Sequence, residues 1–155
     1  MEIKVEPRNA FNGIGVKWSG TYEQAAKGEI RTIQQEFRNR IDQIKNLVNP
    51  NIITGLSYHN DANGFTYYLI AEAESLDFIP EGMEGISVPS YTFVTSSYQG
   101  EQVHEAYSYL HRWIEQNGFT LNQDELFYLE EYPVKYNPLT DPPRLKIHIP
   151  VKEKE

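Results

Sequence analysis

The segment Asp124–Pro138, DELFYLEEYPVKYNP, has the aromatic-rich composition of a β-strand that ends at a proline. Two consecutive carboxylates, Glu130 and Glu131, stand just before that end. Inside a cleft, a carboxylate flanked by aromatic rings would suit a cationic or hydrogen-bond-donating organic ligand, although on a solvated face it would be ordinary. Side chains alternate between the faces of a strand. We therefore expect one face to carry Leu126, Tyr128, Glu130 and Tyr132, and the other to carry Phe127, Leu129 and Glu131.

The elements around this strand alternate between the periods of strands and helices. A Pro-rich segment, PVKYNPLTDPP, leads from it into a last strand, RLKIHIPV. Before it, apolar residues recur every three or four positions from Glu101 to Asn117, which predicts an amphipathic helix that ends at Gly118. The run ISVPSYTFVTSSY, residues 86–98, predicts a strand ahead of that helix.

The first half of the chain shows the same order. Alternating residues at Ala10–Trp18 predict a strand. An apolar stripe then predicts one long helix over Tyr22–Val48, which ends at Asn49-Pro50. Two β-type runs on either side of HNDANG predict a hairpin closed by Asn63-Gly64. The stripe consists of Ile30, Ile33, Phe37, Ile41, Ile44 and Val48.

These repeated periods predict an α+β fold built from tandem strand–helix–strand–strand units. We expect two pseudo-repeats, at about 1–74 and 86–152, within a single domain that covers residues 1–155. The two long helices should cover one face of a mainly antiparallel sheet. A cleft between the halves is then the natural ligand site, and the two halves should superpose.

Composition excludes several classes of function. The 155 residues are 39% hydrophobic and 23% charged, which is typical of one globular domain. A net charge of −8 argues against nucleic-acid binding, which depends on clustered Lys and Arg. The chain has no cysteine, no signal-like start and no transmembrane-length apolar run, so we expect a cytoplasmic protein without membrane contact.

Sequence motifs for cofactors and metals are absent. The glycines in GIG, residues 13–15, lack the spacing of a dinucleotide-binding loop, and no helix follows directly. His104 and His111 are seven residues apart, too far for the i, i+4 metal pair of a helix. The chain also has no G-x-S-x-G motif. We therefore expect neither a cofactor nor a metal.

Several short motifs, taken in order, resemble the GyrI-like effector-binding family. They are VPSYTFVTSSYQG (residues 88–100), the aromatic residues of AYSYLHRWIEQNGF, LEEY (129–132) and KIHIPVK near the C-terminus, with GFTYYLIAEAE similar to the family's first hairpin. The resemblance implies tandem strand–helix–strand–strand units with a ligand cleft between them. The family supplies the sensing modules of AraC-type and MerR-type transcription regulators and also occurs alone. This chain looks like a stand-alone member, since no helix-turn-helix segment precedes the first strand.

The resemblance also implies site residues. The family's Phe-Glu-x-Tyr pattern in its seventh strand matches Leu129 to Tyr132, so that Glu130 and Tyr132 take the pocket positions. This chain departs from the family at Lys146 and His148, where Glu and an aromatic residue are common, and at Phe93, where tyrosine is usual. The candidate ligand-binding residues are Glu130, Tyr132, Trp113, Tyr128, Tyr67, Phe93, Tyr107 and His148.

The leading interpretation is a non-enzymatic protein that binds a small organic ligand. We expect this ligand to be hydrophobic and aromatic, and a positive charge on it is one option. Such a protein would sense or sequester its ligand in transcription regulation or a xenobiotic response. Two alternatives stay open. Some stand-alone relatives hydrolyse electrophilic small molecules, for which Glu130 and Tyr132 would form the acid/base pair. Others are protein-interaction modules that inhibit DNA gyrase, so a protein partner is a further expectation.

Overall fold

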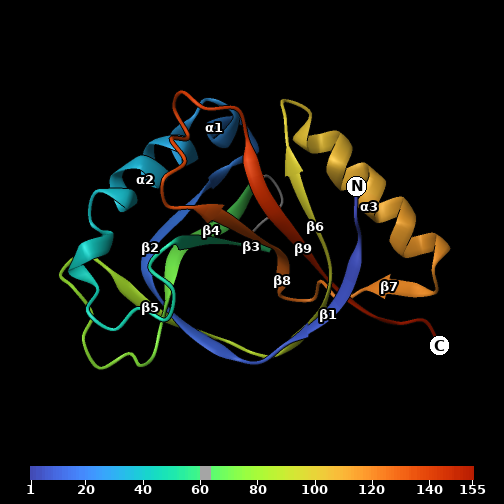
Figure 1. The fold of residues 1–155 in the computed structure, drawn as a ribbon, viewed down its shortest axis with the longest axis horizontal. Coiled ribbons are helices and arrows are strands. Elements are labelled where there is room, and N and C mark those ends of the chain that lie inside the picture. The colour runs from blue at the N-terminus through green and yellow to red at the C-terminus, as the bar shows by residue number, and fades with distance from the viewer. Residues whose placement is uncertain (60–63) are drawn as a thin grey trace.

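The computed structural model describes residues 1–59 and 64–155. The chain forms one large, strongly curved sheet with short helices, shown in Figure 1. The elements are β1 (Lys4–Arg8), β2 (Phe11–Thr21), α1 (Tyr22–Ala26), α2 (Glu29–Arg38), the 3-10 turn η1 (Ile41–Gln43), β3 (Ile52–His59), β4 (Gly64–Ala73), β5 (Glu84–Val88), β6 (Tyr91–Gln99), α3 (Val103–Gln116), β7 (Phe119–Leu121), β8 (Leu126–Pro133) and β9 (Arg144–Glu153).

The order of strands in the sheet is symmetrical about its centre. It reads β1-β6-β9-β8-β3-β4-β2-β5, with β7 added alongside β9, and the described pairs are antiparallel. On either side of the central β8–β3 pair, β9 and β6 take the places that β4 and β2 take in the other half. This arrangement confirms the predicted α+β class with tandem units.

The two halves exchange a strand with each other. β1 precedes the first unit but pairs with β6 of the second, whereas β5 precedes the second unit but pairs with β2 of the first. The two connections run side by side, since Arg8 pairs with Tyr91 and Phe11 with Val88, and both cross the bottom of Figure 1. Each half therefore contributes backbone hydrogen bonds to the other.

Both sets of helices cover the same face of the sheet. That face continues across the centre of the sheet. Gly55 and Ser57 lie on one face of β3, and their cross-strand partners, Glu130 on β8 and Tyr67 on β4, lie on the same face. One core lies beneath α2, and a second lies beneath α3. A third core covers the opposite face and is formed by Leu56, Ile70, Val88, Phe93, Leu126 and Leu129. Within the described residues, no helix is both long and apolar enough to cross a membrane.

The single helix predicted over Tyr22–Val48 is wrong. The segment forms α1, α2 and η1, and the break falls at Gly28, whose φ of 96° is left-handed and ends the regular helical path. A capping box between Thr21 and Gln24 starts α1. The apolar stripe nevertheless packs on one core from Ile30 to Ile44, whereas Val48 is exposed.

The predicted strand over residues 86–98 is in fact two strands. Pro89 interrupts the run because it has no N–H to donate to a neighbouring strand. The chain crosses there from one half of the sheet to the other, so β5 pairs with β2, whereas β6 pairs with β9. β1 and β7 were not predicted at all. On β8 the register shifts opposite Ser57 and Tyr58, and Leu126 packs with Leu129 instead of sharing a face with Tyr128.

The hairpin of β3 and β4 is confirmed by its register from Thr54–Ile70 to His59–Phe65. Residues 60–63 of its predicted turn lie outside the described part of the chain. Gly118 follows α3 with a φ of 81°, which is the left-handed cap that the sequence predicts.

The third core gives a direct test of how tightly the halves are joined. Leu129 is fully buried and lies in register with both Leu56 and His148. Leu129→Ala should therefore lower the free energy of unfolding by about 2–5 kcal/mol, measured in urea. Phe78, which is 67% exposed, is the matched control, and Phe78→Ala should change it by less than about 0.5 kcal/mol. Equal effects would contradict this placement of the core.

Candidate ligand-binding cleft

A cleft opens on the helical face of the sheet, between α2 of the first half and α3 of the second. Its volume is about 270 Å³. A second hollow of about 500 Å³ shares Ile30 and Tyr132 with it and extends beneath the Pro-rich segment Tyr136–Pro143. The cleft is lined by Ile30, Ser57, Phe65, Tyr67, Tyr107, Tyr128, Glu130 and Tyr132.

The only carboxylate in the cleft lining of the described residues, Glu130, is held by two phenol hydroxyls. Tyr107 on α3 donates a hydrogen bond to Glu130 Oε2, and Tyr132 Oη donates to Glu130 Oε1 at 2.8 Å. Burial raises the pKa of Glu130, and the two hydrogen bonds offset part of this rise. In the part of the chain that the structure describes, Glu130 makes no ion pair.

The two donors are suited to this arrangement because they stay protonated. Burial first, and then the charge of Glu130, raise the pKa of Tyr107 well above its usual value. The pKa of Tyr132 is raised for the same two reasons. Both hydroxyls therefore donate to the carboxylate at neutral pH, and the carboxylate keeps a fixed orientation.

Aromatic rings from both halves form the walls. The rings of Tyr107 and Tyr128 meet edge to face at 4.6 Å, and Tyr128 Oη lies 2.9 Å from His111 Nε2. From the first half comes Tyr67, whose buried hydroxyl accepts a hydrogen bond from Gln34 Nε2 at 3.1 Å. A Cβ at position 55 would lie 2.3 Å from Tyr67 Oη, which is too close for two atoms that are not bonded. The missing side chain of Gly55 therefore makes room for the Tyr67 ring.

Three lining residues were not predicted: Ile30, Ser57 and Phe65. Phe65 lies two positions before Tyr67 on β4, so strand alternation from Tyr67 could have identified it. Its ring packs between Trp18, at 5.3 Å, and Tyr22, at 5.2 Å. Ser57 carries no such signal, because only the β3–β4 register brings it beside Tyr67.

The structure brings together five of the predicted site residues and separates three others from them. Glu130, Tyr132, Tyr128, Tyr67 and Tyr107 line the cleft. Phe93 and His148 lie on the opposite face, with their rings edge to face at 5.6 Å. Trp113 lies outside the cleft lining and stacks on Phe119 at 6.1 Å, on the side of α3 that packs against β7.

The neighbouring carboxylate, Glu131, faces away from the cleft and is paired within the protein. His148 Nε2 lies 2.5 Å from its Oε1, and Arg8 Nη1 lies 3.6 Å from its Oε2. Burial alone would raise the pKa of Glu131, but the His148 hydrogen bond and the charges of His148, Arg8 and Lys146 lower it overall. Lys146 pairs in register with Glu131, so its side chain is on the far face from Glu130.

Comparisons with known proteins give one family match and several structures of similar fold. The family model for integron-associated effector binding proteins matches residues 4–151. No curated protein sequence matches the chain. At the identities of the similar solved structures, under 20%, the likeness establishes the fold alone.

Three solved structures illustrate that likeness. SAV2435 bound to tetraphenylphosphonium is 18% identical, with a TM-score of 0.72 over 98% of this chain and 94% of that one. The C-terminal domain of EcmrR, a protein also solved in a DNA complex, is 16% identical, with a TM-score of 0.65 over 98% of each chain. An integron cassette protein from the mobile metagenome of Vibrio cholerae is 16% identical, with a TM-score of 0.63 over 97% of this chain and 95% of that one.

The two adjacent carboxylates should respond in opposite ways to neutralisation. The pKa of Glu130 is raised in the folded state, so its contribution to stability is lost as the pH rises through that pKa. The pKa of Glu131 is lowered in the folded state, so this carboxylate stabilises the fold at any pH above the pKa that it has in the unfolded chain. At pH 8 without ligand, Glu130→Gln should therefore unfold at the same or a higher urea concentration than the parent. Glu131→Gln should lose about 1–3 kcal/mol because Arg8 and His148 lose their charged acceptor. A Glu130→Gln protein that is the less stable of the two would contradict the assignment.

Proposed function

The chain belongs to the integron-associated effector binding protein family, and from this membership we propose that it binds an aromatic, lipophilic cation in the cleft around Glu130. In this proposal the protein is a cytoplasmic sensor or sequestering module for such compounds. The proposal rests on the environment of Glu130. Its carboxylate lies among aromatic rings and accepts hydrogen bonds from two neutral hydroxyls, and in the described structure it forms no ion pair.

The energetics favour a cationic ligand. Burial of a carboxylate costs several kcal/mol, of which two neutral hydrogen bonds return only a part. A cation in the cleft would supply the missing counter-charge and would also lie against ring faces, each of which contributes about 0.5–2 kcal/mol. The walls are amphipathic tyrosines and one phenylalanine, which suit a ligand with several aromatic groups.

The related structures support the same class of ligand. SAV2435 binds tetraphenylphosphonium, which is an aromatic, lipophilic cation. EcmrR combines a domain of this fold with DNA binding, which supports a link between ligand binding and transcription. The acidic charge of this chain, −8, gives no reason to expect that it binds DNA by itself.

The hydrolase alternative has less support from the geometry. A general base needs a free oxygen within hydrogen-bonding distance of the attacking water. Each oxygen of Glu130 already accepts one hydrogen bond, from Tyr107 or Tyr132, so part of its capacity to accept from water is taken. The gyrase-inhibitor alternative stays a prediction, which a pull-down with purified gyrase would test.

Tetraphenylphosphonium is the probe that tests the proposal by calorimetry. Glu130→Gln keeps the shape of the side chain but removes the charge, so the dissociation constant should rise at least about tenfold, corresponding to 1.5–3 kcal/mol for a charge-assisted contact. Glu131→Gln removes the neighbouring carboxylate from the opposite face and should change it less than about twofold. Neutral triphenylphosphine oxide should bind the parent and Glu130→Gln alike. Equal affinity of parent and Glu130→Gln for the cation would refute the proposal.

The binding of the cation should also weaken on acidification. Protonation neutralises Glu130, and because its pKa is raised by burial, the loss begins at a higher pH than for a free glutamate, whose pKa is about 4.3. Calorimetry from pH 8 down through the usual glutamate range, about 4.3, should show the association constant falling for the parent, with proton release on binding in the part of the range where it falls. In Glu130→Gln the profile should be flat. A parent profile as flat as that of the variant would show that Glu130 does not face the ligand.

A further inference from the structure

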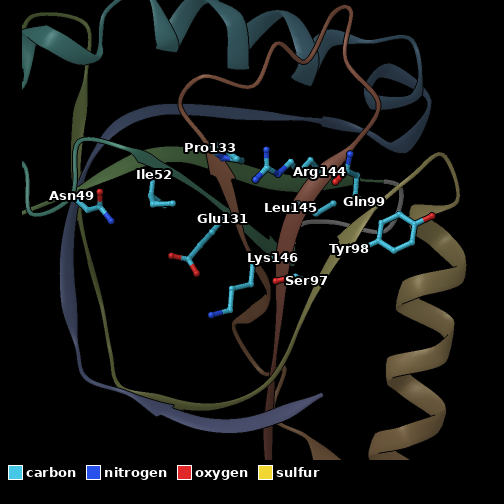
Figure 2. A pocket seen from close by; sticks show the side chains of 10 residues that line it. All are labelled: Asn49, Ile52, Ser97, Tyr98, Gln99, Glu131, Pro133, Arg144, Leu145 and Lys146. Carbon is cyan, nitrogen blue, oxygen red and sulfur yellow. The ribbon is translucent and has the colours of Figure 1, made fainter. Parts of the chain in front are cut away.

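A separate cavity, of about 590 Å³, lies on the far side of β8 from both the Glu130 cleft and the hollow beneath the Pro-rich segment (Figure 2). It opens where β8 and β9 part, because their pairing stops at Glu131–Lys146 and the chain then leaves through the Pro-rich segment. Figure 2 shows the side chains of Glu131 and Lys146 projecting into this space. The cavity is lined by Asn49, Ile52, Ser97, Tyr98, Gln99, Glu131, Pro133, Arg144, Leu145 and Lys146.

Its two cations, Arg144 and Lys146, form no ion pair among the described residues, although the charge of Lys146 acts on the nearby Glu131. Arg144 and Lys146 are two positions apart on β9 and therefore share a face. Lys146 is the cross-strand neighbour of Glu131, yet the ion pairs of Glu131 go to Arg8 and His148. Arg8 in turn also contacts Glu72, at 3.1 Å, so this network satisfies its own charges.

Neutral donors stand next to these cations. The register of β6 and β9 places Ser97 opposite Lys146 and Gln99 opposite Arg144. Asn49 adds an amide whose oxygen accepts the backbone N–H of Asn51 at 2.9 Å, while its nitrogen has no hydrogen-bond acceptor among residues 1–59 and 64–155 and can donate to a ligand. The cavity is thus rich in donors in a chain that carries 22 acidic and 14 basic residues.

Apolar side chains complete the cavity. Ile52 and Pro133 close it on the β3–β8 side, whereas Leu145 and Tyr98 only border it, because their side chains pack in the core beneath α3. An anion without an apolar body would leave these surfaces in contact with water. A carboxylate on an aromatic or branched aliphatic body would use both the cations and the apolar wall.

We propose that this cavity is a second ligand site, specific for a small organic carboxylate held by Lys146 and Arg144. It faces the opposite side of the sheet from the Glu130 cleft and selects the opposite charge. The inference does not depend on the function proposed for that cleft, because no cleft-lining residue takes part in it.

Benzoate is the probe, followed by ¹⁵N NMR titration of the full chain. We expect chemical-shift changes at Ile52, Ser97 and Lys146, with little change at Tyr107 or Tyr128. Benzoate should bind at least about tenfold more tightly than acetate, which lacks the apolar body, and than benzamide, which lacks the charge. Lys146→Met and Arg144→Gln should each weaken benzoate binding at least about fivefold.

Two further variants keep the test decisive. Lys152→Met removes an exposed lysine from the same strand, outside the cavity, and should leave the affinity within about twofold. Lys146→Arg keeps the charge and should keep most of the affinity, which separates loss of the cation from loss of the fold. The proposal is overturned if benzoate shifts only cleft residues, if acetate or benzamide binds as well, if Lys152→Met matches Lys146→Met, or if benzoate does not bind.

Discussion

Alternation along β8 sends two consecutive carboxylates to opposite faces at the centre of the sheet, and both must be compensated there. Glu131 receives its compensation from the protein, through Arg8 and His148. Glu130 receives two neutral hydroxyl donors and no counter-charge in the described structure. Because an unpaired carboxylate in a partly buried site raises the free energy of the folded state, Glu130 is the group that we propose a ligand satisfies. Because Glu131 pairs with Arg8 and His148, Lys146 and Arg144 form no ion pair on the far face in the described part of the chain.

The central position of β8 follows from the symmetry of the sheet. The exchange of β1 and β5 ties the outer strands of each half to the other, and the β8–β3 pair joins the halves in the middle. The helices pack on separate cores to either side, so the strip above β8 and β3 stays uncovered and becomes the cleft. The absent side chain of Gly55 leaves space there for Tyr67. The cleft is therefore a consequence of the two-unit architecture, and both units supply its walls.

The aromatic cleft and the donor-rich cavity lie back to back, and the same few strands set the chemistry of both. β8 contributes Glu130 to one and Glu131 to the other. Leu145 at the start of β9 borders both the cavity and the hollow beneath the Pro-rich segment. A ligand on either face would contact strands whose opposite side lines the other hollow.

Local patterns in the sequence determined the class of fold and the face of β8 that Glu130 shares with Tyr128 and Tyr132. The periods of the segments, the hairpin flanks, the cap at Gly118 and the position of Glu130 between tyrosines are properties of neighbouring residues, and the structure shows each of them. Only the tertiary structure decided which aromatic residues join Glu130. Alternation shows which residues of one strand share a face, but the faces of β6 and β9 relative to β8 depend on registers between strands far apart in the chain. That is why Phe93 and His148 lie behind the sheet. The exchange of β1 and β5 escaped the sequence patterns for the same reason: a hydrophobic period records that a face is buried, not which partner buries it. The break at Gly28 is local, set by a left-handed backbone that the apolar stripe does not record.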